Sequence, residues 1–182
     1  MRHLLILLVV ASALCAQEPK KQDKAKLISG AFTAPAVSYQ VPSTWKLQKN
    51  RSTMRLGTWR LPGKGDVDVV VYFFGAGGGG GVEANFARWA GQVESKAEPT
   101  KRKMKTKGGT VHLIDTSGTY VAPVRPGARD RNNKPDHRLL GAYVDVKGGP
   151  LYVKVIGPSK VVSAEAAAIE AFLKSMKPAK KK

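Results

Sequence analysis

The sequence predicts an α+β fold in which an antiparallel sheet is sandwiched by two amphipathic helices. Two pairs of strand-like segments are each joined by a short glycine-containing turn, which is typical of antiparallel hairpins. Two further segments carry apolar residues at helical spacing, and such helices must bury their apolar stripe against another layer. The order along the chain is strands, helix, two hairpins and helix, which favours helices packed on the faces of one sheet.

The first strands are expected at residues 37–41, 53–61 and 66–74. The first of them ends at Pro42, and the second carries apolar residues among polar ones, as a half-buried strand does. The third has apolar residues on both of its alternating faces, which predicts a central strand buried on both sides. One of its faces carries Val67, Val69, Val71 and Phe73, and the other carries Val70, Tyr72 and Phe74.

A helix is expected to begin at Val82, directly after a run of glycines. Its apolar residues form one stripe with helical spacing, in which a tryptophan is more often part of a core than of a ligand groove. The stripe consists of Val82, Phe86, Trp89, Ala90 and Val93. The other side carries Asn85, Arg88 and Gln92, which we expect to point away from the sheet. They are candidates for binding a partner, with a solvated face as the alternative.

The second half of the chain reads as two hairpins and a closing helix. The hairpins are expected at residues 101–106 with 110–121, and at 139–147 with 151–157, with a long polar loop over 122–137 between them. The closing helix is expected to be capped by Ser163, with Glu165 in its first turn and Lys174 in its last. Its apolar stripe is Ile169, Phe172, Leu173 and Met176.

Positive charge dominates the composition, but it is unevenly placed. Lysine and arginine number 31 against 13 aspartates and glutamates, a formal net charge of +18. Most of the excess lies in residues 20–26, 101–107 and 177–182, so the rest of the domain is nearly balanced. Basic blocks can bind polyanions by releasing counterions, or they can act as solvated segments that keep a protein dispersed. No recognisable nucleic-acid module accompanies them, so nucleic acid is not the expected partner.

The basic segment 101–107 is expected to be an edge strand. Alternation would place Lys101, Lys103, Lys105 and Lys107 on one face, opposite Arg102, Met104 and Thr106. Neither face is apolar enough to be buried in the middle of a sheet. Edge lysines deter pairing with another chain. The alternative is a ladder of cations about 7 Å apart that binds a polyanion.

The N-terminus predicts a secretory signal peptide over residues 1–16. Arg2 and His3 precede the apolar run 4–10, and small residues follow. The run is too short to span a bilayer. Cleavage is expected after Ala16, while cleavage after Cys15, or a lipid anchor on Cys15, is the alternative. We therefore expect an exported protein, periplasmic or extracellular, whose mature chain has no cysteine.

The domain organisation expected from these segments is simple. A polar basic linker covers residues 17–29, a single α+β domain covers 30–176, and a basic tail covers 177–182. The basic linker and tail, or a lipidated Cys15, would allow association with a membrane surface.

The glycine run 75–81 matches a dinucleotide-binding pattern literally, through Gly75, Gly77 and Gly80, and it also follows a strand and opens a helix. A run so rich in glycine matches almost any glycine pattern, however, and the acidic residue that should end a second parallel strand is missing. We therefore expect a flexible exposed loop there, or a weak anion site at the amides before Val82. We also expect no metal site, because the two histidines of the mature chain lie far apart and basic residues surround the acids of the long loop.

The order of the strands, the segment Val41-Pro42-Ser43-Thr44-Trp45 and the closing amphipathic helix resemble the Mog1/PsbP-like superfamily of α/β/α sandwiches. The resemblance covers roughly residues 30–176. A closer likeness is to exported bacterial proteins of that fold, through Val82-Glu83-Ala84-Asn85, Arg88-Trp89, Gly91-Gln92, Gly118-Thr119-Tyr120 and Gly157-Pro158. Members of the superfamily are mostly non-catalytic, so the resemblance implies a binding or accessory role and transfers no functional residues.

The function expected from the sequence is thus an exported, non-enzymatic binding or accessory module without a cofactor. Its partner would be a protein or an acidic envelope polymer. The candidate ligand-binding residues are Gly77, Gly78, Gly79, Asn85, Arg88 and Gln92. Two alternatives stay open: a hydrolase of an envelope polymer, which would need two facing carboxylates in a cleft, and a polyanion-binding protein. The last would use Lys101, Lys103, Lys105 and Lys107.

Overall fold

The computed structural model describes residues 26–179, which form two antiparallel sheets and two helices. The main sheet has the order β3-β4-β5-β10-β9-β8-β6, and β7 also pairs with β8. Its strands are β3 (Lys46–Leu47), β4 (Arg55–Arg60), β5 (Asp68–Phe73), β6 (Val93–Glu94), β7 (Thr100–Lys105), β8 (Gly109–Tyr120), β9 (Lys134–Val146) and β10 (Leu151–Pro158). Both predicted hairpins, β7-β8 and β9-β10, are present.

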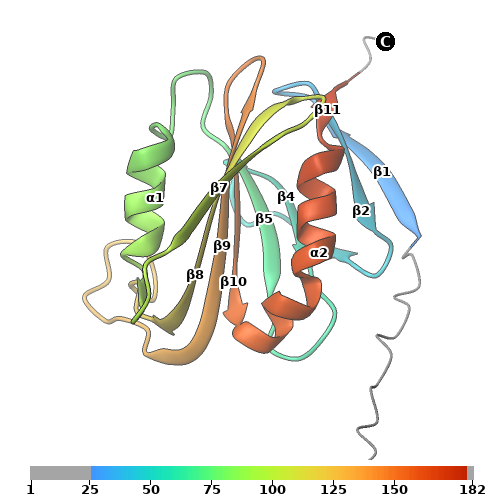
Figure 1. Ribbon diagram of the computed structural model, residues 1–182. Coiled ribbons are helices and arrows are strands. Elements are labelled where there is room, and N and C mark those ends of the chain that lie inside the picture. Colours follow the sequence, from blue (N-terminus) through green and yellow to red (C-terminus); the bar gives the residue numbers. More distant parts are fainter. Residues whose placement is uncertain (1–25, 180–182) are drawn as a thin grey trace, which may run out of the picture.

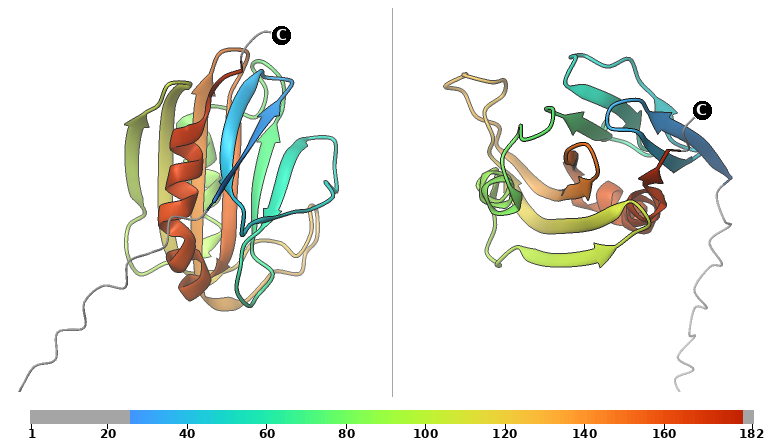
Figure 2. Two further views of the ribbon diagram at one scale, coloured as in Figure 1. Left: turned by 90° about the vertical axis from the view of Figure 1, so that its right-hand side faces the viewer. Right: turned by 90° about the horizontal axis from the view of Figure 1, so that it is seen from above.

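The two helices lie on opposite faces of the main sheet, as the sequence predicts (Figure 1). Helix α2 (Ser159–Ser175) shares its face with a second, small sheet, which the sequence does not predict. That sheet consists of β1 (Leu27–Phe32), β2 (Val37–Pro42) and β11 (Lys177–Pro178), and Figure 2 shows β1 and β2 beside α2. Helix α1 (Val82–Ala90) lies alone on the other face. The predicted α+β sandwich is therefore confirmed.

The larger core fills the space between the main sheet, α2 and the small sheet. The predicted stripe of α2 is fully buried, with Ile169, Phe172, Leu173 and Met176 at most 2% exposed. The ring of Phe172 contacts two tryptophans, with ring centroids 5.7 Å from Trp45 and 5.6 Å from Trp59. The Trp45 Nε1 donates a hydrogen bond of 2.9 Å to Glu165 Oε2, which satisfies the indole where it is buried.

The smaller core lies under α1. Phe86 and Trp89 project from the helix onto β8 and β9, as the predicted stripe requires. Trp89 rests directly on Gly141, because a Cβ added there would lie 2.3 Å from Trp89 Cε3. The helix therefore sits over β8 and β9, and the parts of β10, β5 and β4 on the same face carry no helix. On β5 the second face is accordingly only partly covered, with Tyr72 half-buried and Phe74 37% exposed.

The edge position of the basic strand is confirmed. Among the described strands, β7 pairs only with β8. Its side chains alternate as predicted: Met104 packs against the larger core and Arg102 binds Glu170 of α2, while Lys101 reaches Glu83 of α1 on the other face.

Two boundaries within the predicted domain differ from the structure. Helix α2 begins at Ser159 rather than at Ser163, because Pro158 already ends β10 at the N-cap position. Ser163 and Glu165 consequently lie inside the helix, and the Ser163 Oγ accepts a hydrogen bond from Arg138. The polar loop ends at residue 133, since β9 already begins at Lys134, where pairing with β8 stabilises a segment that polarity alone marks as loop.

Strands β1 and β11 extend the folded unit beyond the range 30–176. The first begins within the expected linker and the last within the expected tail, and both pair with β2. The expected signal peptide, Cys15, most of the linker and residues 180–182 lie outside the described residues. Within the described part, no helix is long and apolar enough to cross a membrane.

Because Trp89 lies directly on Gly141, adding a single methyl group at position 141 should clearly destabilise the protein. We expect Gly141→Ala to lower the free energy of unfolding by about 1–3 kcal/mol, because the new Cβ must displace a buried indole. Gly91→Ala is the matched control, since its φ is −65° and its added Cβ would meet only the Ala87 carbonyl oxygen at 3.4 Å. Urea unfolding measures both. An equal cost in the two variants would contradict the packing described.

Candidate functional site

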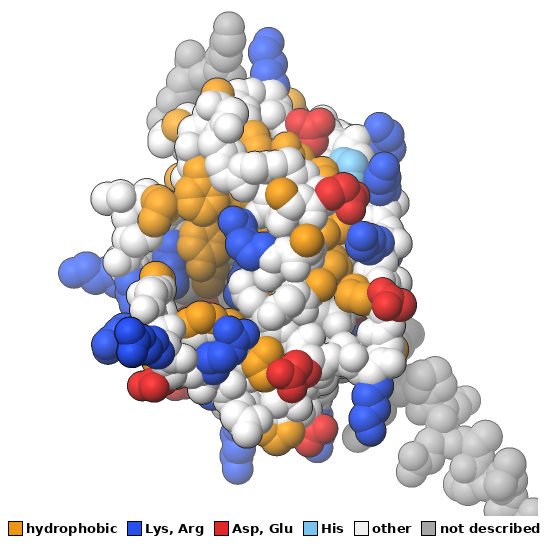
Figure 3. Space-filling view, turned by 90° about the vertical axis from the view of Figure 1, so that its left-hand side faces the viewer, with side chains coloured by type: hydrophobic (Ala, Val, Ile, Leu, Met, Phe, Trp, Pro, Cys, Tyr) orange, Lys and Arg blue, Asp and Glu red, His pale blue; other side chains and the backbone are white. Residues whose placement is uncertain are grey.

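The part of the sheet that α1 leaves bare is polar and aromatic rather than apolar. Strands β10, β5 and β4 present Lys154, Tyr72 and Arg55 there, on the same face as α1. Figure 3 views the molecule from the α1 side, where Lys and Arg side chains surround a hollow with hydrophobic side chains at its floor. Two adjoining pockets occupy this region, and we call them together the basic groove.

The first pocket, the lysine pocket, has a volume of about 290 Å³. Its floor is formed by β5 and β10, and the start of β4 and the end of β8 form its sides. It is lined by Arg51, Arg55, Asp66, Asp68, Val70, Tyr72, Tyr120, Lys154 and Ile156. The second pocket, of about 370 Å³, lies beside it under the segment between β3 and β4 and shares Arg51, Arg55 and Asp68 with it. The second pocket is completed by Gln48, Lys49, Asn50, Thr58 and Arg60.

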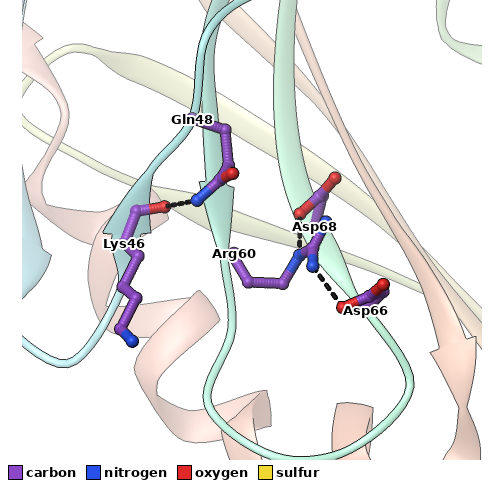
Figure 4. Close-up of polar contacts among 5 residues, drawn as sticks. All are labelled: Lys46, Gln48, Arg60, Asp66 and Asp68. Atoms are coloured by element: carbon purple, nitrogen blue, oxygen red, sulfur yellow. Dashed lines mark hydrogen bonds and ion pairs between the residues drawn. The ribbon is translucent and has the colours of Figure 1, made fainter.

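The two acidic residues of the basic groove are both engaged by one arginine. Arg60 Nε donates to Asp68 Oδ1, and Arg60 Nη1 donates to Asp66 Oδ1 (Figure 4). Hydrogen bonding to Asp68, the largest cause, together with the charge of both aspartates raises the pKa of Arg60. Figure 4 also shows Gln48, which is turned back on its own strand through a 3.0 Å bond from its Nε2 to the Lys46 carbonyl oxygen.

The remaining cations of the basic groove have no acidic partner. Among the described residues, Lys49, Arg51, Arg55 and Lys154 form no ion pair within 4.0 Å. The Arg55 guanidinium instead lies over the Tyr72 ring, 5.6 Å from its centroid. Five basic side chains therefore face two acidic ones, and both acids are already bound by Arg60. The basic groove carries a surplus of positive charge.

Lys154 is the most constrained of these cations. It lies in the middle of β10, between Val153 and Val155, which are at most 1% exposed. Its Nζ donates a hydrogen bond to Gln92 Oε1 and lies 5.8 Å from the centroid of the Tyr120 ring. Burial, and secondarily the charge of Arg88, lower the pKa of Lys154 to about 8. Its ammonium group is therefore poorly stabilised by its surroundings.

The aromatic wall of the lysine pocket is itself held in place. The ring of Tyr120 stacks on His137, with centroids 6.3 Å apart and an interplanar angle of 14°. Burial raises the pKa of Tyr120, so its hydroxyl stays protonated at neutral pH. Tyr72 stacks on Phe74 with an interplanar angle of 5°. The pocket thus has two aromatic rings and a protonated Tyr120 hydroxyl beside its cations.

The glycine run that precedes α1 is anchored rather than free, which contradicts the expectation of a flexible loop. Asn85, only 1% exposed, donates from Nδ2 to the carbonyl oxygens of Gly79, Gly80 and Gly81. The Tyr152 hydroxyl donates to the carbonyl oxygens of Gly78 and Gly80. Gly75, Gly77, Gly79 and Gly80 have φ between 76° and 84°, which only glycine adopts without strain.

The environment of the glycine run also differs from that of a dinucleotide site. Such a site needs a parallel βαβ unit, whereas β5 pairs antiparallel with both β4 and β10. The candidate residues Gly78 and Gly79 direct their carbonyl oxygens at Tyr152 and Asn85. Gly77 lies at the exposed outer end of the loop.

Asn85, Arg88 and Gln92 do not share a solvated face. The expectation that they point away from the sheet is wrong for Asn85 and Gln92, whereas Arg88 is exposed. Asn85 is buried against the glycine run, and Arg88 donates from Nη2 to Asn85 Oδ1. Gln92, just beyond the helix, reaches the sheet and binds Lys154. Of the six predicted ligand-binding residues, Gln92 is the one that contacts a residue lining the basic groove. An i+3 or i+4 spacing groups residues on a helix, but it does not say which group faces the sheet.

The lysines of β7 lie apart from the basic groove. Lys103 and Lys105 line a separate hollow of about 260 Å³ with Met104, Thr110 and His112. Within this row, Lys101 binds Glu83 at 3.3 Å and Lys105 donates to Thr110 Oγ1 at 2.9 Å. Lys107 lies beyond the strand, in the turn that leads to β8.

The central residues of the basic groove are ones that sequence reasoning missed. Arg51, Arg55, Tyr72, Tyr120 and Lys154 come from four separate segments, and no short motif joins them. One feature of the sequence points to the site: Lys154 is the one charged residue in the otherwise apolar strand segment 151–157. A lysine in the middle of an apolar strand must either reach solvent or occupy a special environment.

The arrangement that would support a hydrolase is not seen in the described residues. The two carboxylates of the basic groove, Asp66 and Asp68, lie on the same guanidinium, which is the geometry of an ion pair rather than of two carboxylates facing across a substrate. Within residues 26–179, no group of three or more histidine, aspartate or glutamate side chains is placed to hold a metal ion.

Comparison with known proteins bears on the fold. Neither a protein-family model nor a curated protein matches the sequence. The structure is similar to the solution structure of cyanobacterial PsbP (CyanoP) from Synechocystis sp. PCC 6803, with a TM-score of 0.52 and 11% sequence identity. The match covers 90% of this chain and 98% of that chain. It confirms the PsbP-like fold that the sequence predicts.

The lowered pKa of Lys154 predicts an unusual dependence of stability on pH. Between about pH 8 and 10.5 the unfolded chain holds a proton on this lysine that the folded chain has released, so stability rises with pH in that window. We expect a gain of about 1–2 kcal/mol between pH 7.5 and 9.5 in urea unfolding. Lys154→Met should abolish the gain, whereas Lys64→Met, in an exposed turn, should keep it. A parallel pH profile for wild type and Lys154→Met would contradict the assignment.

Proposed function

We propose that this PsbP-like domain is an exported, non-enzymatic binding module and that its ligand carries negative charge. The single observation that supports the proposal most directly is the surplus of cations in the basic groove. Lys154, Arg55 and Arg51 face a hollow without an acidic partner among the described residues, and the only acids there are bound by Arg60. A bound anion would supply the missing partner.

Electrostatics make such a site favourable for an anion. Bringing several cations together in a partly buried hollow costs free energy, and this is visible in Lys154, whose pKa falls partly because Arg88 is near. An anion bound between them removes that repulsion and gains charge-assisted hydrogen bonds. The two pockets have volumes of about 290 and 370 Å³, near the lower end of the range for small-molecule sites. A small organic anion, or one charged group of a larger molecule, fits this size.

The tyrosine rings of the lysine pocket widen the range of anions that can bind there. Tyr72 and Tyr120 line the lysine pocket together with Arg55 and Lys154, so a ligand there can contact aromatic rings as well as charges. The export part of the proposal has its support in the N-terminal sequence, where a positive start, a short apolar run and small residues follow one another.

A second candidate is polyanion binding by the lysines of β7. The observation in its favour is the hollow beside Lys103 and Lys105 on an exposed edge strand. Against it, Lys101 is paired with Glu83 and Lys105 is bonded to Thr110, so the row is not a set of free cations. We therefore place the ligand in the basic groove.

Binding of citrate, used as a probe anion, separates the two candidates. We expect Arg55→Gln and Lys154→Gln each to weaken citrate binding about tenfold in calorimetry at neutral pH and low salt, because each removes one charge-assisted contact. Affinity should also fall as pH rises through about 8, where Lys154 loses its charge.

Two control variants complete this experiment. Lys147→Gln removes an exposed charge that lines neither pocket and should leave citrate binding unchanged. A triple variant, Lys101→Gln with Lys103→Gln and Lys105→Gln, should leave citrate binding unchanged as well. A loss in the triple variant alone, accompanied by earlier elution from heparin resin, would move the site to β7. Equal losses in all variants would show attraction by net charge and refute the basic groove as the site.

A further inference from the structure

Lys154 differs from an ordinary ion-pairing lysine in how its amino group is held. The described residues place no carboxylate within 4.0 Å of its Nζ, and the nitrogen is anchored by the neutral acceptor Gln92 Oε1. The apolar side chains of Val70 and Ile156 line the same pocket. This is an environment that favours a neutral amine over an ammonium group.

Among the described residues, the charged groups around Lys154 that have no ion-pair partner are cations. Arg88 of α1 repels its positive charge, and Arg55 of β4 adds another cation to the same pocket. Tyr72 of β5 and Tyr120 of β8 also line the pocket. Asp68 of β5 and Asp66 before it are held by Arg60. A lysine that is partly desolvated and next to other cations is one of the ways in which proteins make a nucleophilic amine.

We propose that Lys154 is a nucleophile that forms an imine with an anionic carbonyl compound, such as a 2-oxo acid or an aldehyde acid, bound in the lysine pocket. The proposal rests on the anion-binding function of the basic groove and narrows the class of its ligand. The carboxylate of such a compound would pair with Arg55 or Arg51, and its carbonyl carbon would face the Lys154 Nζ.

Imine formation needs no reagent other than the amine and the carbonyl compound. The lone pair of the neutral Lys154 amine attacks the carbonyl carbon, a C–N bond forms, and the carbonyl electron pair moves to oxygen, which takes up a proton. The nitrogen then loses a proton, the hydroxyl group leaves as water and a C=N bond forms. Amine plus carbonyl compound thus gives imine plus water. The protonated Tyr120 hydroxyl lines the pocket and can supply the proton with which the oxygen leaves.

The local pKa makes this reaction selective among the lysines of the chain. With a pKa of about 8, roughly one-tenth of Lys154 is neutral at pH 7. For a lysine with a pKa near 10.4, the neutral fraction is only about 0.0004. Part of this advantage is lost because a less basic amine is a weaker nucleophile, so we expect a net preference of tenfold or more.

Reductive trapping with glyoxylate tests the proposal. Full-length protein is incubated with glyoxylate and cyanoborohydride at neutral pH, and the carboxymethylated lysines are identified and timed by peptide mass spectrometry. We expect Lys154 to be labelled at least tenfold faster than the exposed Lys64 and Lys147 in the same sample, with a rate that rises towards a plateau above about pH 8. Citrate should protect Lys154 and not the two exposed lysines.

Two further arms test whether the anionic group is recognised. Arg55→Gln should slow glyoxylate labelling of Lys154 several-fold while leaving its labelling by acetaldehyde, which has no carboxylate, unchanged. Lys154→Arg should lose this label, and its far-ultraviolet circular dichroism shows whether the variant is folded.

The outcomes separate this inference from the proposed function. Labelling of Lys154 no faster than that of Lys64, with citrate binding intact, would overturn the imine inference and leave the anion-binding groove standing. Acetaldehyde labelling Lys154 as fast as glyoxylate would overturn the anionic character of the carbonyl ligand. If the wild-type protein neither binds citrate nor shows faster labelling of Lys154, the proposed function itself is wrong.

Discussion

The seating of Trp89 on Gly141 is the contact on which the arrangement of the α1 face depends. A glycine in the middle of β9 allows the indole to lie against the backbone, and this fixes α1 over β8 and β9. Asn85 and Tyr152 then hold the preceding glycine run to the start of the helix and the sheet, so the helix cannot shift across the face without breaking buried hydrogen bonds. Because α1 is short and placed to one side, β10, β5 and β4 stay uncovered. The basic groove is the direct result.

An uncovered sheet face must either be polar or attract a partner, and here it is polar. The side chains on it satisfy each other only in part. Arg60 binds Asp66 and Asp68, and Arg55 lies on Tyr72, but Lys154 has a neutral amide and an aromatic ring as its neighbours. The result is a hollow with more positive charge than its own acids can balance. Unpaired charge of this kind costs stability, and the proposed bound anion would offset that cost.

The sequence predicts the architecture better than the site, and the reason is physical. The spacing of apolar residues indicates which side of a single helix or strand is buried. The buried sides of α2 and of the Trp89 helix, and the central strand 66–74, can therefore be predicted. The basic composition of residues 101–107 predicts an edge strand. Periodicity does not report which strands become neighbours, and the basic groove depends on that. Arg55, Tyr72, Tyr120 and Lys154 are brought together by the pairing of β4, β5 and β10 and by the length of β8. Asn85 was misplaced because its partners, the glycine carbonyl oxygens, are backbone atoms that every sequence has.

On the exposed half of the α1 face, Lys154 is partly desolvated and has no ion-pair partner among the described residues, and we propose that it binds anions there. The most direct test is a nuclear magnetic resonance titration of the lysine side chains, with and without citrate. The proposed anion site requires one lysine, absent from the spectrum of Lys154→Arg, with a pKa near 8 that moves upward when citrate is added. A Lys154 resonance that titrates with the other lysines, near a pKa of 10.4 and with no response to citrate, would contradict it.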